Sequence, residues 1–73
     1  MNIEQIAMDC LDVNEETLQT SSMELKEIDA WYYSNPMRGG LSMIINRDGE
    51  KLVANSSISF QQHYSDFCQG KRN

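Results

Sequence analysis

The chain has 73 residues, a net charge of −5, 40% hydrophobic side chains and 23% charged side chains. A chain of this length forms one domain with a thin core, because roughly 60 residues bury only about 60% of their unfolded surface. No apolar run approaches the ~20 residues that a membrane helix needs, and Met1 does not open a signal peptide. We therefore expect one domain over residues 1–73, located in the cytoplasm of a bacterial cell.

The acidic charge is concentrated near the N-terminus. Residues 1–29 carry eight acidic side chains against Lys26 alone, a local charge of −7, whereas residues 30–73 carry +2. An acidic half disfavours direct binding to nucleic-acid phosphates and attracts a basic partner. The alternative is that the acidic surface only keeps a small protein in solution.

The N-terminal third predicts one helix and leaves a second segment open. Asn2 is a suitable N-cap with Gln5 at the third helical position, as in a capping box. Apolar residues then recur at helical spacing, which predicts a helix over residues 3–11. Asn14 can cap a further short helix, so residues 13–25 are either helix or loop.

Three β-prone runs follow this segment. Residues 28–33 contain three consecutive aromatic side chains and are closed by Pro36, which has no N–H to donate to a ladder. Residues 41–46 and 51–55 flank an Asp-Gly pair, which is typical of a tight hairpin. These runs predict a three-stranded antiparallel sheet.

The C-terminal segment predicts a second helix. Ser59 is its N-cap, Gln62 completes a second capping box, and Gly70 is suited to end the helix. Its expected sheet-facing stripe consists of Phe60, Tyr64, Phe67 and Cys68. The predicted fold is α+β in the order α-β-β-β-α, with both helices on one side of the sheet.

No catalytic or metal-binding motif stands out. His63 is the only histidine, and no nucleophile is marked for it to activate. Cys10 and Cys68 are expected to be small buried hydrophobic residues, and Asp48 and Glu50 are explained by the hairpin turn. We expect a non-enzymatic protein with no metal, no cofactor and no direct nucleic-acid contact.

The expected sheet has more large apolar side chains than one face can hold. Two short helices cover one face, so others should remain exposed on the second face. If Ile45 faces the helices, Ile44 points outward. On the aromatic strand, either Trp31 with Tyr33 or Tyr32 points outward as well. The alternative is that residues 13–25 fold over these side chains.

An exposed aromatic patch of this kind usually marks an interface. The predicted partner-binding residues are Trp31, Tyr33, Arg38, Ile44, Glu15 and Glu16. The aromatic side chains would supply the buried contact and the glutamates would attract a basic partner.

The order of features also resembles a known family. Trp31-Tyr32-Tyr33, the Gly39-Gly40 step, the apolar strand that reaches the turn at Gly49, and a final Ser-Phe-x-x-x-Tyr-x-x-Phe helix resemble the YrhB-like immunity proteins of bacterial toxin systems. That family usually has Gly-Asn-x-Pro before its central strand, where this chain has Gly39-Gly40-Leu41-Ser42. The resemblance implies a cytosolic toxin-binding protein without enzymatic activity.

The leading hypothesis is therefore a small protein-binding module that blocks a basic toxin or a nucleic-acid enzyme, as an immunity protein or antitoxin does. The alternative is a structural homodimer that closes an exposed sheet face or an unpaired strand edge.

Overall fold

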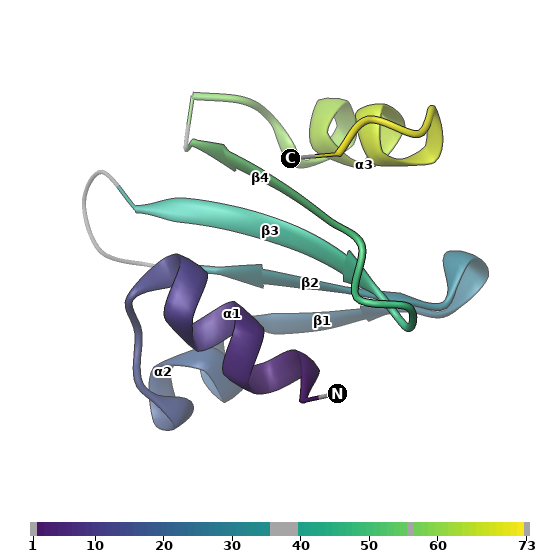
Figure 1. The fold of residues 1–73 in the computed structure, drawn as a ribbon. Coiled ribbons are helices and arrows are strands. Elements are labelled where there is room, and N and C mark those ends of the chain that lie inside the picture. Colours follow the sequence, from purple (N-terminus) through teal and green to yellow (C-terminus); the bar gives the residue numbers. More distant parts are fainter. Residues whose placement is uncertain (1, 36–39, 56, 73) are drawn as a thin grey trace.

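The computed structural model describes residues 2–35, 40–55 and 57–72. In this part of the chain, a four-stranded antiparallel sheet of order β1-β2-β3-β4 lies between helices on both faces (Figure 1). The elements are α1 (Ile3–Leu11), α2 (Glu15–Thr20), β1 (Ser22–Leu25), the 3-10 helix η1 (Lys26–Ile28), β2 (Ala30–Ser34), β3 (Leu41–Asn46), β4 (Lys51–Asn55) and α3 (Phe60–Cys68). The predicted α+β class is confirmed, but three strands is one too few.

The additional strand comes from the segment that the sequence left open. Residues 13–25 form the short helix α2 and then β1, which pairs antiparallel with β2 from Ser22↔Tyr33 to Leu25↔Ala30. Between the two strands, η1 turns the chain and Asp29 adopts a left-handed conformation with φ 51°. Aspartate tolerates this region better than most residues. The predicted strand therefore begins at Ala30, two residues later than expected.

The hairpin is confirmed at the predicted bounds. β3 pairs antiparallel with β4, and Ile44 lies opposite Leu52. Gly49 has φ 87°, which is the left-handed conformation that the Asp-Gly turn was expected to use. The side-chain oxygen of Asn46 accepts hydrogen bonds from the backbone N–H groups of Asp48 and Glu50, both at 3.0 Å. The chain entry to this hairpin, with Pro36 and Arg38, lies outside the described residues.

The three helix N-caps are present, although only half of each predicted capping box forms. Each cap oxygen accepts a hydrogen bond from a backbone N–H: Asn2 from Gln5 (3.1 Å), Asn14 from Thr17 (2.8 Å) and Ser59 from Gln62 (3.2 Å). The reciprocal bonds predicted for Gln5 and Gln62 are wrong. Each of these side-chain amides donates instead to an aspartate four residues further along, at 3.0 Å in α1 and 2.8 Å in α3.

Helix α3 ends as the sequence predicts. Gly70 has φ 93°, its N–H donates to Phe67 O at 3.0 Å, and the N–H of Lys71 donates to Asp66 O at 3.1 Å. This pair of bonds is a Schellman motif. Arg72 stacks its guanidinium 3.7 Å from the centre of the Phe67 ring and donates to Phe67 O at 2.8 Å. The positive charge of Arg72 is therefore in contact with the C-terminal end of α3, which carries the negative end of the helix dipole.

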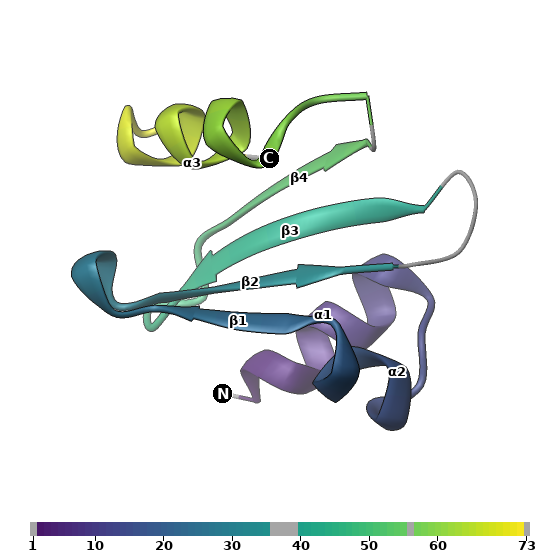
Figure 2. The ribbon, with the colours of Figure 1, turned by 180° about the vertical axis from the view of Figure 1, so that it is seen from behind.

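The helices lie on opposite faces of the sheet, so the prediction that both cover one side is wrong (Figure 2). The core under α1 and α2 consists of Ala7, Leu11, Leu18, Tyr33, Met43 and Ile45. The core under α3 consists of Leu25, Ala30, Ile44 and Phe67. Because successive strand residues alternate between faces, Ile44 and Ile45 both become fully buried, each beneath a different helix. The outward orientation predicted for Ile44 is therefore wrong.

Candidate functional site

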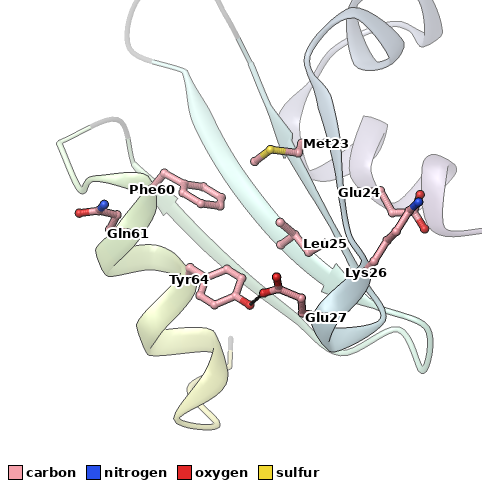
Figure 3. A pocket seen from close by; sticks show the side chains of 8 residues that line it. All are labelled: Met23, Glu24, Leu25, Lys26, Glu27, Phe60, Gln61 and Tyr64. Carbon is pink, nitrogen blue, oxygen red and sulfur yellow. Dashed lines mark hydrogen bonds between the residues drawn. The ribbon is translucent and has the colours of Figure 1, made fainter.

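An open groove separates β1 and η1 from helix α3 (Figure 3). It arises because α3 packs mainly on β3 and β4 and leaves this face of β1 uncovered by any other described element. The groove has a volume of about 520 Å³. Its lining residues are Met23, Glu24, Leu25, Lys26, Glu27, Phe60, Gln61 and Tyr64.

The groove is apolar inside. Met23 on β1 and Phe60 on α3 stand at its two sides, 44% and 36% exposed, and Leu25 is buried between the elements (Figure 3). Phe60 makes an edge-to-face contact with Tyr32, with ring centres 4.9 Å apart. Among the described residues only three large hydrophobic side chains are exposed, and Met23 and Phe60 are two of them; the third is Leu41. Exposed apolar surface is therefore concentrated here.

A polar contact spans one end of the groove. The hydroxyl of Tyr64 donates to the carboxylate of Glu27 at 3.2 Å. Burial first, and then this hydrogen bond, raises the pKa of Tyr64 above its ordinary value. Glu24 and Lys26 extend from β1 and η1 away from α3 (Figure 3). The charged side chains thus border the apolar interior without entering it.

His63 holds α3 on the sheet. It is 1% exposed, and its Nε2 lies 2.7 Å from the backbone oxygen of Leu52. A carbonyl oxygen can only accept, so Nε2 carries a proton. Nδ1 lies 3.4 Å from the hydroxyl of Ser42. His63 therefore lies within the buried stripe of α3 and is hydrogen-bonded to the sheet. A side chain this buried is not in reach of a substrate.

The remaining α3 stripe is only partly as predicted. Phe67 is buried, but Cys68 is exposed and Phe60 borders the groove. The buried stripe instead includes His63, which lies one turn before Phe67, and Cys68 falls outside it. Cys10 is half-buried, and both cysteines are free thiols.

Trp31 and Tyr33 are brought together, but on the face opposite the groove. Together with Asn2, Ile3 and Glu4 they line a second hollow of about 470 Å³ beside α1. Tyr33 is only 6% exposed, so the exposure expected of it as a contact residue is wrong. Burial, and to a lesser degree the nearby charge of Glu4, raises the pKa of Tyr33. Trp31 is half-buried against the same core.

The other predicted contact residues do not join this pair. Ile44 lies beneath α3 on the opposite face. Glu15 and Glu16 are exposed in the first turn of α2, where a negative charge also stabilises the helix dipole. Arg38 lies outside the described residues. A partner contact by Glu15 and Glu16 stays a prediction.

The residues that define the groove were missed in the sequence. Met23 and Leu25 alternate with charged residues as a half-buried strand does, and this signal was available. Phe60 was assigned to the packed stripe of α3 because helical spacing alone does not show how far the helix extends beyond the strands beneath it. Glu27 and Tyr64 are 37 residues apart, and only the fold joins them.

Within residues 2–35, 40–55 and 57–72, no group of three or more His, Cys, Asp or Glu side chains is arranged to hold a metal ion. No helix in that same part of the chain has the length and hydrophobicity required to cross a membrane. Comparison of the chain with family models, curated proteins and solved structures finds no match. Membership of the YrhB-like family therefore stays a prediction.

Proposed function

We propose that this protein is a non-enzymatic binding module that inhibits a basic partner protein by occupying it, as an immunity protein or antitoxin does. The groove between β1 and α3 is the proposed contact surface. The observation that carries this proposal is the exposure of Met23 and Phe60 on facing sides of one apolar groove. Exposed apolar side chains that face each other across a groove favour a binding site over isolated surface positions, which are common in any domain.

The charge of the protein favours a basic partner. Residues 1–29 carry a charge of −7, and this total includes Glu24, Glu27 and Lys26 of the groove lining. Acidic surface of this kind accelerates the encounter with a basic protein and repels acidic ones. Apolar contact in the groove would then slow dissociation.

The mechanism is steric. Seating a partner over the groove would bury Met23 and Phe60 and place the acidic residues beside it, so that basic residues needed for the partner's own activity are covered. The resemblance to YrhB-like immunity proteins supports this role and a cytoplasmic location.

Self-association through the same groove is less favourable. A second copy would bring its own acidic residues, including Glu24 and Glu27, towards those of the first. Like charges placed together oppose association. The homodimer is therefore an alternative outcome of the following test.

Site-specific cross-linking tests the proposal. Gln61→p-benzoylphenylalanine places a photoreactive group on the groove, and Gln19→p-benzoylphenylalanine places the same group on the exposed side of α2 as a matched control. Both variants are produced in the natural host and irradiated. We expect position 61, and not position 19, to capture a basic protein. Its activity should fall when the purified binding module is added.

Two results would contradict this function. One is that position 61 cross-links only to a second copy of the chain, which would favour the homodimer. The other is that the captured protein binds the module with unchanged affinity after Phe60→Ala, which would make the groove irrelevant to the contact.

A further inference from the structure

The exposed edge of β1 indicates how a partner is held. Building on the proposed function, we infer that the groove takes an extended segment of the partner, which pairs with β1 as a fifth strand and alternates apolar with basic side chains. This assigns both a binding mode and a recognisable pattern to the partner.

β1 has one free edge. It pairs with β2 on one side, and in the described part of the chain no strand follows it on the other. In an antiparallel ladder, alternate residues direct their N–H and C=O groups away from the neighbour. An outer edge of this kind is a template for an incoming strand, and main-chain hydrogen bonds then supply affinity with little dependence on sequence.

The groove lies beside this edge, on one face of the sheet. Met23 and Leu25 point to that face, as does Tyr32, which pairs with Met23. In paired strands, directly opposite residues share a face. A residue of the added strand opposite Met23 or Leu25 would therefore project on the face that carries the groove, beside Met23, where an apolar side chain would extend the apolar surface that Met23 and Phe60 form.

The neighbouring positions of the added strand face the other way. They lie on the same side as Glu24, which alternates with Met23 and points away from α3 (Figure 3). A lysine or arginine there would be next to the carboxylate of Glu24. The same carboxylate disfavours pairing with a second copy of β1, because the two strands would place their glutamates on one face. Glu24 thus favours a basic residue at the position beside it and opposes self-pairing, whereas Lys26, which extends to the same side just beyond β1, disfavours a second basic residue there.

The length of the incoming segment is also limited at one end of β1. The hydrogen bond from Tyr64 to Glu27 joins α3 to η1, just beyond the last residue of β1. An extended segment beside Ser22–Leu25 therefore has room for about four residues at this depth. A short motif is sufficient to fill the groove.

A defined peptide tests the inference. The probe is acetyl-Lys-Val-Lys-Leu-Lys-Val-Lys-amide with a fluorescent label, titrated with the full chain and followed by anisotropy. We expect saturable binding that is weakened at least about tenfold by Phe60→Ala, since the apolar contact is lost. Leu41→Ala is the matched control, because Leu41 is similarly exposed at 38% but does not line the groove. It should leave binding unchanged.

Backbone methylation separates strand pairing from simple apolar docking. One peptide carries backbone N-methyl groups on its three apolar residues. A second peptide carries them on the last three of its four lysines. Only one set of N–H groups faces β1, so one peptide should bind about as well as the parent and the other at least about tenfold more weakly. Replacing every lysine of the probe with glutamate should abolish binding.

Three outcomes would overturn the inference. They are no saturable binding of the probe, equal binding of the two methylated peptides, or equal binding of the glutamate peptide. None of these outcomes contradicts the proposed function, because a partner captured at position 61 can occupy the groove with a folded surface. The proposed function is tested by the cross-linking experiment alone. Failure of the cross-linking test, in contrast, removes the proposed function itself.

Discussion

The two faces of the sheet differ in how completely they are covered. On one face, α1 and α2 bury a core that includes Leu18, Met43 and Ile45, all at 0% exposure. On the other face, α3 is the only described helix that covers the sheet. It buries Ile44 completely over β3, but near β1 it leaves Met23 exposed and Phe60 beside a groove.

The difference follows from width. A helix is about 10 Å across and neighbouring strands are about 4.8 Å apart, so one helix covers roughly two strands. Two helices suffice for a four-stranded sheet face, and one does not. The uncovered half of the α3 face is thus a direct consequence of the added strand β1, and it is where we place the partner.

The largest predicted effect concerns the centre of the sheet, where the two faces should behave alike. Ile44→Ala and Ile45→Ala should each destabilise the protein by about 2–5 kcal/mol, because both side chains are fully buried. In a domain with a few kcal/mol of stability, this loss can prevent folding. Urea unfolding of the milder pair Ile44→Val and Ile45→Val, at about 0.5–1.5 kcal/mol each, keeps the comparison measurable. A neutral Ile44→Val would show that the α3 face is not a true core.

The next effect concerns the polar attachment of α3. His63→Leu replaces the imidazole with an apolar side chain of similar size and removes the hydrogen bond to Leu52 O. We expect a loss of about 1–3 kcal/mol of unfolding free energy. Gln69→Leu, at an exposed position of the helix end, should change it by less than about 0.5 kcal/mol. Equal losses for the two variants would contradict the structural role of His63.

The helix ends offer a matched pair across the two faces. Gly70 follows α3 with φ 93°, and Asp12 follows α1 with φ 55°. Gly70→Ala should cost about 1 kcal/mol, although an added Cβ meets no atom within 4 Å, because the cost is conformational. Asp12→Gly should be neutral or stabilise by up to about 1 kcal/mol. Thermal unfolding of both variants checks the opposite signs, and a Gly70→Ala protein as stable as wild type would contradict them.

A smaller effect on stability should appear at alkaline pH, on the face of the sheet that α1 and α2 cover. Burial, followed by the charge of Glu4, raises the pKa of Tyr33, so the folded state holds this proton more tightly than the unfolded state does. The resulting stability is fully present below about pH 10 and is lost as the pH rises through the folded pKa. Stability should therefore fall less steeply above pH 10 in Tyr33→Phe than in wild type. Parallel curves for the two proteins would contradict this assignment.

The groove should contribute less to stability than the buried centre of the sheet. Phe60→Ala removes a side chain that is 36% exposed, so its cost should be well below the ~3–5 kcal/mol typical of a buried phenylalanine. Urea unfolding measures this cost directly. A loss as large as that of Ile44→Ala would indicate that Phe60 is part of the core and that the groove is a packing feature.

The sequence predicted elements better than their arrangement. Helical spacing and Asn2 give α1, Asp48-Gly49 gives the hairpin, and Ser59 with Gly70 gives α3, because these signals are local. Which face a helix covers is decided by contacts between distant segments, and local patterns do not contain that information. The placement of α1 and α3 on the same side was wrong for this reason.

The groove was missed for the same reason. It depends on β1, and four residues after a short helix carry too little periodicity to be assigned as a strand with certainty. Without β1 there was no groove, so the apolar excess was attributed to Ile44 and to either Trp31 with Tyr33 or Tyr32 on an open face of the sheet. The prediction of an apolar interface counted the large side chains correctly, but it assigned them to a three-stranded sheet that lacked β1.

The most direct test compares how variants on the two faces of the sheet change the affinity for the partner. The affinity of the partner captured at position 61 is measured for the double variants Met23→Ala/Phe60→Ala and Glu15→Gln/Glu16→Gln. We predict at least about a tenfold loss for the first and less than about a threefold loss for the second, because α2 contributes only long-range attraction. The reverse order, with the glutamates of α2 dominant and the groove neutral, would contradict the central claim that the half-covered α3 face binds the partner.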